Sequence, residues 1–280
     1  MRSGTIDYVV IGHITQDLTP QGPVVGGTAA YAARTARALG CRVGVVTSAR
    51  RDLDVRAALP GIAVRCLPAE VTTTFENIYA PAGRRQFVRA VARRLDATAI
   101  PPDWRRAPIV HLGPVAQEVD PALVHAFPLA LIGVTPQGWL RHWEEDGEVS
   151  PCAWVQAQRV LVQATAVVLS PEDVGGDEAL LADYARQAHI LVVTRGRAGS
   201  TVTWMGETRR FPAPPVTEVD PTGAGDVYAA AFFVRLYETR DPWEAARFAT
   251  CLAARSVTRP GLAGTPTPED IAQCKRGPLV

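Results

Sequence analysis

The chain has 280 residues, of which 47% are hydrophobic and 20% are charged, a balance that suits a folded domain with an ample core. Its formal net charge of +1 argues against nucleic acid or another polyanion as a partner. No apolar run approaches the ~20 residues of a membrane span, and the N-terminus is too acidic for a secretory signal, so we expect a cytoplasmic protein without a membrane partner.

Counts of single residue types exclude several kinds of site. The five cysteines are scattered without a C-x-x-C pair, so we expect free thiols in a reducing compartment rather than a zinc site or disulfides. The five histidines form no metal-binding pair, and we interpret them as structural. Lys275 is the only lysine and lies outside any glycine-rich loop. A Walker A motif, a protein-kinase lysine and Schiff-base chemistry are therefore disfavoured.

Strand-like and helix-like segments alternate along the chain. Apolar, β-branched runs predict strands at residues 8–12, 42–47, 63–67, 109–112, 130–134, 166–169, 190–194, 201–205 and 208–211. Alanine-rich or periodic segments predict helices at residues 28–40, 51–59, 177–187, 226–237, 242–258 and 268–275. This alternation predicts an α/β fold, in which a mostly parallel sheet is covered by helices on both faces.

Residues 71–94 depart from this alternation. Aromatic and β-branched residues at 71–79 and again at 84–91 flank a turn at Ala82-Gly83, with polar and apolar residues alternating on both sides. Such a pattern predicts a β-hairpin. We expect this hairpin to act as a lid rather than to join the central sheet.

A glycine-punctuated turn, Asp220 to Asp226, leads directly into an apolar helix-like segment. Free amides at a helix N-terminus bind anions, and Gly223 and Gly225 would let a ligand approach the backbone closely. An acid at such a position is a poor phosphate ligand, so we interpret Asp226 as a base that takes a proton from a hydroxyl. The alternative is that Asp226 merely caps the helix.

Other polar groups also follow predicted strands and would line one edge of a doubly wound sheet. They are Asp17, the Gly26-Gly27 pair, the acidic segment 170–173 and the basic glycine turn 194–199. A phosphate-binding helix end, a basic turn and acids for Mg²⁺ together point to a nucleotide polyphosphate. The combination predicts phosphoryl transfer without a P-loop.

The order of these motifs resembles the ribokinase/PfkB family of carbohydrate kinases. Asp220-Pro221-Thr222-Gly223-Ala224-Gly225-Asp226 is similar to the C-terminal signature of that family, and the resemblance spans nearly the whole chain. It implies a ribokinase-like three-layer α/β/α sandwich with a mostly parallel sheet and a small β lid. It also implies one kinase domain over residues 1–280, with the lid contributed mainly by residues 71–94 and residues 15–25 as a second candidate contributor.

The resemblance implies a role for each motif. Asp226 matches the catalytic base, and the amides of Gly223, Ala224 and Gly225 match the anion hole for the transferred phosphoryl group. The residues implied for ATP are Thr194, Gly196, Gly199, Thr222, Ala253 and Val257. Those implied for the acceptor are Asp17, Gly26, Gly27 and Tyr31. The implied cofactors are ATP and Mg²⁺, with a monovalent cation as a further family property, and the chain would be a monomer or a homodimer formed through the lids.

Two departures from the family pattern bear on the site. The family usually carries Asn-x-x-Glu where this chain reads Ser170-Pro171-Glu172-Asp173, so Asp173 or the competing Glu172 becomes the candidate metal ligand. Many sugar-specific members carry asparagine four residues after the glycine pair, where this chain has Tyr31. We therefore do not assume ribose-like recognition and consider a sugar, a cyclitol, a nucleoside or another polyol as the acceptor.

Alternative functions stay open at this point. Arg84, Arg85 and Arg89 in the predicted hairpin suggest a phosphosugar kinase, although they equally suit a solvated hairpin face. A ligand sensor that kept the fold without catalysis would explain the altered 170–173 segment, but the intact Asp226 argues against it. A nicotinamide-dependent oxidoreductase is disfavoured because Gly-x-Gly-x-x-Gly is absent.

Overall fold

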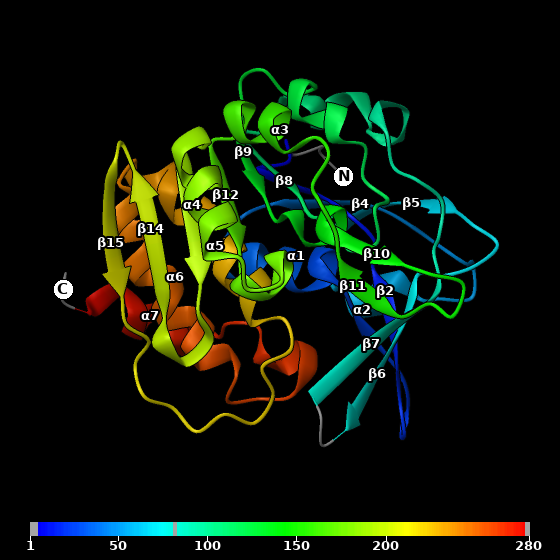
Figure 1. Cartoon of the computed structure of the whole chain (residues 1–280). Coiled ribbons are helices and arrows are strands. Elements are labelled where there is room, and N and C mark those ends of the chain that lie inside the picture. Colours follow the sequence, from blue (N-terminus) through cyan, green and yellow to red (C-terminus); the bar gives the residue numbers. More distant parts are fainter. Residues whose placement is uncertain (1–4, 81–82, 278–280) are drawn as a thin grey trace.

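The computed structural model describes residues 5–80 and 83–277 of the chain (Figure 1). Within these ranges a nine-stranded sheet forms the centre of the fold, in the order β15-β14-β13-β12-β9-β8-β1-β4-β5. Its strands are β1 Tyr8–Ile11, β4 Val43–Ala49, β5 Ala63–Pro68, β8 Ile109–Leu112, β9 Leu131–Val134, β12 Ala166–Leu169, β13 Ile190–Thr194, β14 Ser200–Trp204 and β15 Glu207–Phe211. The strands from β13 to β5 run parallel, and β14 and β15 extend one edge in antiparallel fashion.

Helices cover both faces of this sheet, so the predicted layered α/β fold is confirmed. One apolar layer contains the buried faces of α1 (Thr28–Ala38), α5 (Ala224–Thr239) and α6 (Pro242–Ser256), with α7 (Pro268–Arg276) beside α6. The opposite layer contains α3 (Ala157–Gln163) and α4 (Glu178–Gln187). None of the helices in the described ranges is both long and apolar enough to cross a bilayer.

The predicted helix at 51–59 is wrong in its first half, because α2 spans only Val55–Ala58. The Asp54 carboxylate accepts a hydrogen bond from the backbone N–H of Ala57 and thereby caps a helix that begins after it. Upstream, the guanidinium of Arg50 pairs with Asp52, which holds this segment as a turn.

Helix α5 is the innermost helix, and its sequence explains why. Alanines and aromatic residues at 227–234 are buried almost without interruption, so the helix has apolar residues around most of its circumference. It packs closely on the sheet at Gly133, where a Cβ atom would lie only 2.4 Å from the Phe233 ring. Small residues in the helix and in the sheet therefore let α5 reach the sheet and fix where its N-terminus lies.

A second sheet stands at the carboxyl edge of the first and projects to the lower right in Figure 1. In the described residues it has the order β3-β2-β6-β7. Its strands are β2 Thr15–Thr19, β3 Gly22–Gly26, β6 Thr74–Ala80 and β7 Gly83–Ala90, and a short hairpin of β10 Arg141–Trp143 and β11 Val149–Pro151 contacts β7. The predicted turn at Ala82-Gly83 lies partly outside the described residues. Cross-strand pairing places Asp17 beside Phe75, and Asn77 beside Gln86, on a common face.

Buried hydrogen bonds tie both ends of the β6–β7 hairpin to the loop after β1. The Nε2–H of His13 donates to the carbonyl of Arg93, and its Nδ1 accepts from the Thr73 hydroxyl, so one imidazole holds the chain before β6 and after β7. The backbone N–H of His13 donates in turn to the buried carboxylate of Glu118. The interpretation of His13 as a structural residue agrees with these contacts, which orient the small sheet over the large one.

The expectation of free thiols throughout is wrong for one pair of cysteines. Cys251 on α6 and Cys274 on α7 form a disulfide, with their Cα atoms 5.6 Å apart, whereas Cys41, Cys66 and Cys152 are free. The two cysteines are 23 residues apart and carry no local motif. Packing of α7 on α6 brings them together, which a search for closely spaced cysteines could not anticipate.

We predict that replacing Cys251 and Cys274 together by serine lowers the free energy of unfolding by about 2–4 kcal/mol, because the disulfide restricts the unfolded chain. Urea unfolding followed by circular dichroism, with and without reductant, measures the difference. Cys152→Ser serves as the control and should respond to reductant as the original protein does. Equal stability of the oxidised and reduced protein would show that the disulfide does not contribute.

Candidate active site

Two adjoining cavities open at the carboxyl edge of the central sheet. The first, the small-sheet cavity, has a volume of about 380 Å³ and lies between the small sheet and the N-termini of α1 and α5. The second, the α6 cavity, has a volume of about 590 Å³ and lies against α6 and the 213–218 segment. Residues that line both are Ser170, Thr194, Pro221 and Gly225. The start of α5 therefore stands where the two cavities meet.

The backbone at this junction depends on a glycine lying against an aromatic ring. Gly223 precedes α5 with φ of 78°, in the left-handed region, and a Cβ atom on it would lie 2.3 Å from the ring of Tyr31. Tyr31 itself belongs to α1 and is buried. The ring thus supports the start of α5, and Gly223, Tyr31 and Gly225 all line the small-sheet cavity.

Asp226 lies in the first turn of α5 and lines the small-sheet cavity. Its carboxyl group is hydrogen-bonded to the side chain of Thr28, the first residue of α1, and the residue at the N-cap position of α5 is Gly223, not Asp226. The pKa of Asp226 is raised to about 6, mainly because burial removes hydration from the carboxylate. The hydrogen bond with Thr28 and the positive charge of Arg141 lower this pKa, and the negative charge of nearby Asp173 raises it. The arrangement favours a base over a helix cap.

Asp17, which we predicted to bind the acceptor, belongs to β2 and lines the same cavity. The predicted pair Gly26-Gly27 supports it in different ways. Gly27 lines the cavity and precedes α1 with φ of 88°, where a Cβ atom would approach the His13 carbonyl oxygen to 2.6 Å. Gly26 lies behind Asp17, because a Cβ atom there would come within 2.6 Å of the carboxylate oxygen Oδ2. Gly27 therefore shapes the cavity wall, and Gly26 leaves room for the Asp17 carboxylate.

Sequence reasoning missed several polar residues that complete this cavity. Arg141, at the start of β10, donates from Nη1 to the Val115 carbonyl and lies over the Phe75 ring at 5.5 Å. The Gln86 amide donates to the Asn77 side-chain oxygen across the β6–β7 pair. The other missed lining residues with polar side chains are Thr15, Thr28, Thr135 and Gln137. The hairpin face could have suggested Asn77 and Gln86, but nothing near Arg141 in the sequence marks it.

The α6 cavity contains most of the residues predicted for a nucleotide. Thr194, Gly196 and Gly199 follow β13, and Ala253 and Val257 come from the end of α6. Position 199 requires glycine because the backbone of Phe211 passes close to it. A Cβ atom at this position would lie 2.0 Å from the carbonyl oxygen of Phe211.

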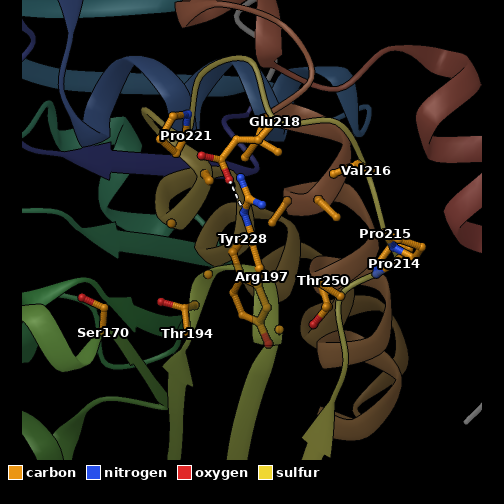
Figure 2. A pocket seen from close by; sticks show the side chains of 18 of the residues that line it. Ser170, Thr194, Arg197, Pro214, Pro215, Val216, Glu218, Pro221, Tyr228 and Thr250 are labelled. Carbon is orange, nitrogen blue, oxygen red and sulfur yellow. Dashed lines mark hydrogen bonds and ion pairs between the residues drawn. The ribbon is translucent and has the colours of Figure 1, made fainter.

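Thr222 differs from this prediction, since it lines the small-sheet cavity instead. Figure 2 shows Arg197 paired with Glu218 among the residues around the α6 cavity, with N–O distance 3.1 Å. Arg195 of the same turn pairs with Glu178, so neither guanidinium of the basic turn stands alone.

The 170–173 segment forms a compact turn between the cavities. The backbone N–H and the hydroxyl of Ser170 both donate to Asp173 Oδ2, at 2.8 and 2.9 Å, and the Gln137 amide donates to Oδ1 at 3.3 Å. Asp173 faces the small-sheet cavity, whereas Glu172 lines the α6 cavity. In the described residues no group of three or more potential ligands converges on one point. One or two carboxylates of this kind suit Mg²⁺, which keeps several waters and binds chiefly through substrate phosphates.

Several known kinases are similar to this chain. The pfkB family carbohydrate kinase model matches residues 163–270. The chain is 27% identical over 248 residues to a cytidine kinase of Thermococcus kodakarensis, covering 81% of this chain and 87% of that protein.

Solved structures of the ribokinase family share the fold. A pyrophosphate-dependent kinase complexed with a pyrophosphate analog and myo-inositol superimposes with TM-score 0.78 at 20% identity, over 95% of this chain and 99% of the other. Arabidopsis thaliana ribokinase complexed with ribose and ATP gives TM-score 0.75 at 18% identity, over 98% and 100% of the two chains. These likenesses confirm the predicted ribokinase-like fold.

We predict that Gly225→Ala impairs activity without destabilising the protein. A Cβ atom at Gly225 meets no other atom within 4 Å and would project into open space where the cavities join, in a helix that tolerates alanine well. The turnover number should fall at least about tenfold while the urea midpoint stays or rises. Gly223→Ala, which clashes with Tyr31, should lose both activity and stability. Full activity of Gly225→Ala would show that no ligand approaches this amide.

Proposed function

We propose that the chain transfers the terminal phosphoryl group of ATP to a hydroxyl of a small polyhydroxylated acceptor, because the pfkB family carbohydrate kinase model matches residues 163–270 and the chain is similar to a cytidine kinase over most of its length. The acceptor would occupy the small-sheet cavity and the nucleotide the α6 cavity. The observation that carries the proposal is the position of Asp226 beside Gly223–Gly225, at the junction of the two cavities.

The proposed reaction uses the start of α5 in two ways. The acceptor hydroxyl gives its proton to the Asp226 carboxylate as its oxygen forms a bond to the γ-phosphorus, while the bond from that phosphorus to the β,γ-bridging oxygen of ATP breaks and ADP leaves. The amides of Gly223, Ala224 and Gly225, at the positive end of α5, stabilise the charge on the phosphoryl oxygens. Positioning and charge stabilisation provide most of the catalysis in phosphoryl transfer.

Glu172 and Asp173 are the proposed carboxylates for Mg²⁺, through its bound waters. Both belong to the turn between the cavities, and the hydrogen bonds from Ser170 and Gln137 orient Asp173. When bound, Mg²⁺ would neutralise charge on the phosphates of ATP. The 170–173 turn would then hold the metal near the phosphates without the asparagine common in the family.

The lining of the α6 cavity supports a nucleotide as the donor over pyrophosphate. Apolar groups from Pro214, Pro215 and Val216, together with Ala253 and Val257, line this cavity of about 590 Å³. Such a space suits the flat apolar faces of a nucleobase, whereas pyrophosphate has no group to fill it.

The charges around the small-sheet cavity support a neutral acceptor over a sugar phosphate. Three carboxylates, Asp17, Asp173 and Asp226, face one guanidinium, that of Arg141. Of the hairpin arginines that suggested a phosphosugar, Arg85 pairs with Glu148, and Arg89 pairs with Glu76. The side chain of Arg84, the third, lies outside the described residues.

We predict that Asp226→Asn lowers kcat at least about a hundredfold and leaves the acceptor KM nearly unchanged, because general-base catalysis contributes about 10²–10⁴ to the rate. In the original enzyme, kcat/KM should fall tenfold per pH unit below a midpoint near the Asp226 pKa of about 6, since only the carboxylate accepts the proton, and should level off above it. Steady-state kinetics from pH 4.5 to 9 measure both effects. Asp103→Asn, at an exposed acid, is the control. Retained activity in Asp226→Asn would remove this residue from the role of base.

We further predict acceptor-dependent release of ADP from ATP with Mg²⁺, and little or no transfer from pyrophosphate. Cytidine, myo-inositol, ribose and fructose form the first acceptor panel, and fructose 6-phosphate tests the phosphosugar alternative. A coupled ADP assay, with phosphorus NMR of the product, measures transfer from each donor. Binding of a panel member by calorimetry without turnover would indicate a sensor, and efficient transfer from pyrophosphate would contradict the assignment of the α6 cavity to a nucleotide.

A further inference from the structure

A line of buried side chains runs from the core of the central sheet to the small-sheet cavity. The Tyr8 hydroxyl on β1 is 2.8 Å from Nδ1 of His111 on β8, and Nε2 of His111 is 2.9 Å from Oγ1 of Thr135. Tyr8 and His111 are fully buried, and Thr135 is 8% exposed. Thr135 follows β9 and lines the small-sheet cavity, so the line ends where we place the acceptor.

The directions of these hydrogen bonds follow from counting hydrogens. Burial lowers the pKa of His111 to about 3, so the imidazole is neutral and carries one N–H. Within the described residues His111 is the hydrogen-bond partner of the Tyr8 hydroxyl. If Nδ1 carried the proton, the buried Tyr8 hydrogen would have no acceptor, at a cost of about 1–3 kcal/mol. Tyr8 therefore donates to Nδ1, and the Nε2–H of His111 donates to Thr135.

This order leaves the Thr135 hydroxyl with a hydrogen to give. Its oxygen already accepts a hydrogen bond from His111. The Thr135 side chain lies close to Gly113 and to Thr28. A Cβ atom built on Gly113 would be 2.5 Å from Thr28 Cγ2 and 3.4 Å from Thr135 Oγ1. The same Thr28 is hydrogen-bonded to Asp226. Thr28, Thr135 and Asp226 all line the small-sheet cavity, so its wall presents both an acceptor of hydrogen bonds, Asp226, and a donor, Thr135.

We infer that Thr135 is a specificity-determining residue for the acceptor, and that its hydroxyl donates a hydrogen bond to an acceptor oxygen adjoining the one that reacts at Asp226. Tyr8 and His111 are positioning residues that keep this hydroxyl in the donating direction. The inference rests on the proposed function, because it takes the small-sheet cavity as the acceptor site. It favours acceptors with oxygens on neighbouring carbons, such as a vicinal diol.

The kinetic test compares Thr135→Val, which keeps the shape and removes the hydroxyl, with Thr135→Ser, which keeps the hydroxyl. With cytidine or myo-inositol, whichever the original enzyme phosphorylates, the valine variant should raise the acceptor KM roughly 3- to 10-fold, as expected for one neutral hydrogen bond. The KM for ATP should stay within about twofold, and serine should restore the acceptor KM. Thr208→Val, at an exposed threonine on β15, is the matched control. A valine variant that loses stability but keeps the acceptor KM would overturn the inference.

A second measurement is independent of any acceptor. Nitrogen-15 NMR of histidine-labelled protein, with His111 assigned by its loss in His111→Gln, reports which imidazole nitrogen carries the proton. We expect a single neutral form, protonated at Nε2 and unchanged from pH 5 to 9, and a mixture of tautomers in Tyr8→Phe. Protonation at Nδ1 would overturn the inference, since Thr135 would then donate to His111. If no panel member is phosphorylated, the proposed function fails, whereas the tautomer still decides the direction of the hydrogen bonds.

Discussion

The contact of the Gly223 backbone with the Tyr31 ring is the constraint on which the site depends. Because no side chain fits between them, the start of α5 lies directly on α1, and the N-termini of both helices meet at the carboxyl edge of the sheet. This meeting lets Thr28 of α1 reach Asp226 of α5. The amides of residues 223–225 and the proposed base therefore share one support, the packing of the start of α5 on α1.

The electrostatics of the site follow from this packing. A carboxyl group in the first turn of a buried helix loses hydration, which raises its pKa, while one hydroxyl and one guanidinium compensate only in part. The resulting value of about 6 lies close to neutral pH, as suits a proton acceptor. Asp173, which opposes that compensation, is itself held by Ser170 and Gln137, so the substituted 170–173 segment affects both the proposed metal position and the base.

Much of the fold and part of the site could be predicted from local sequence. Apolar β-branched runs indicated the strands of the central sheet, and the 220–226 signature indicated the pfkB family, whose model matches residues 163–270. Arg141 escaped notice because it lies in a polar segment whose position depends on how the β10–β11 hairpin contacts β7. The Cys251–Cys274 disulfide escaped notice because the two cysteines share no local sequence motif. The packing of α7 on α6 brings their sulfur atoms together.

The sequence by itself determined the alternation of strands and helices, the glycines of the phosphate-binding turns and the presence of an acid at 226, because these depend on local conformation and spacing. Only the tertiary structure decided that Asp226 lacks full hydration and contacts Thr28, that Thr222 faces the small-sheet cavity, and that Tyr8 and His111 orient Thr135. These properties depend on distances between residues far apart in the chain. Such distances arise when α1, α5 and the sheet pack together.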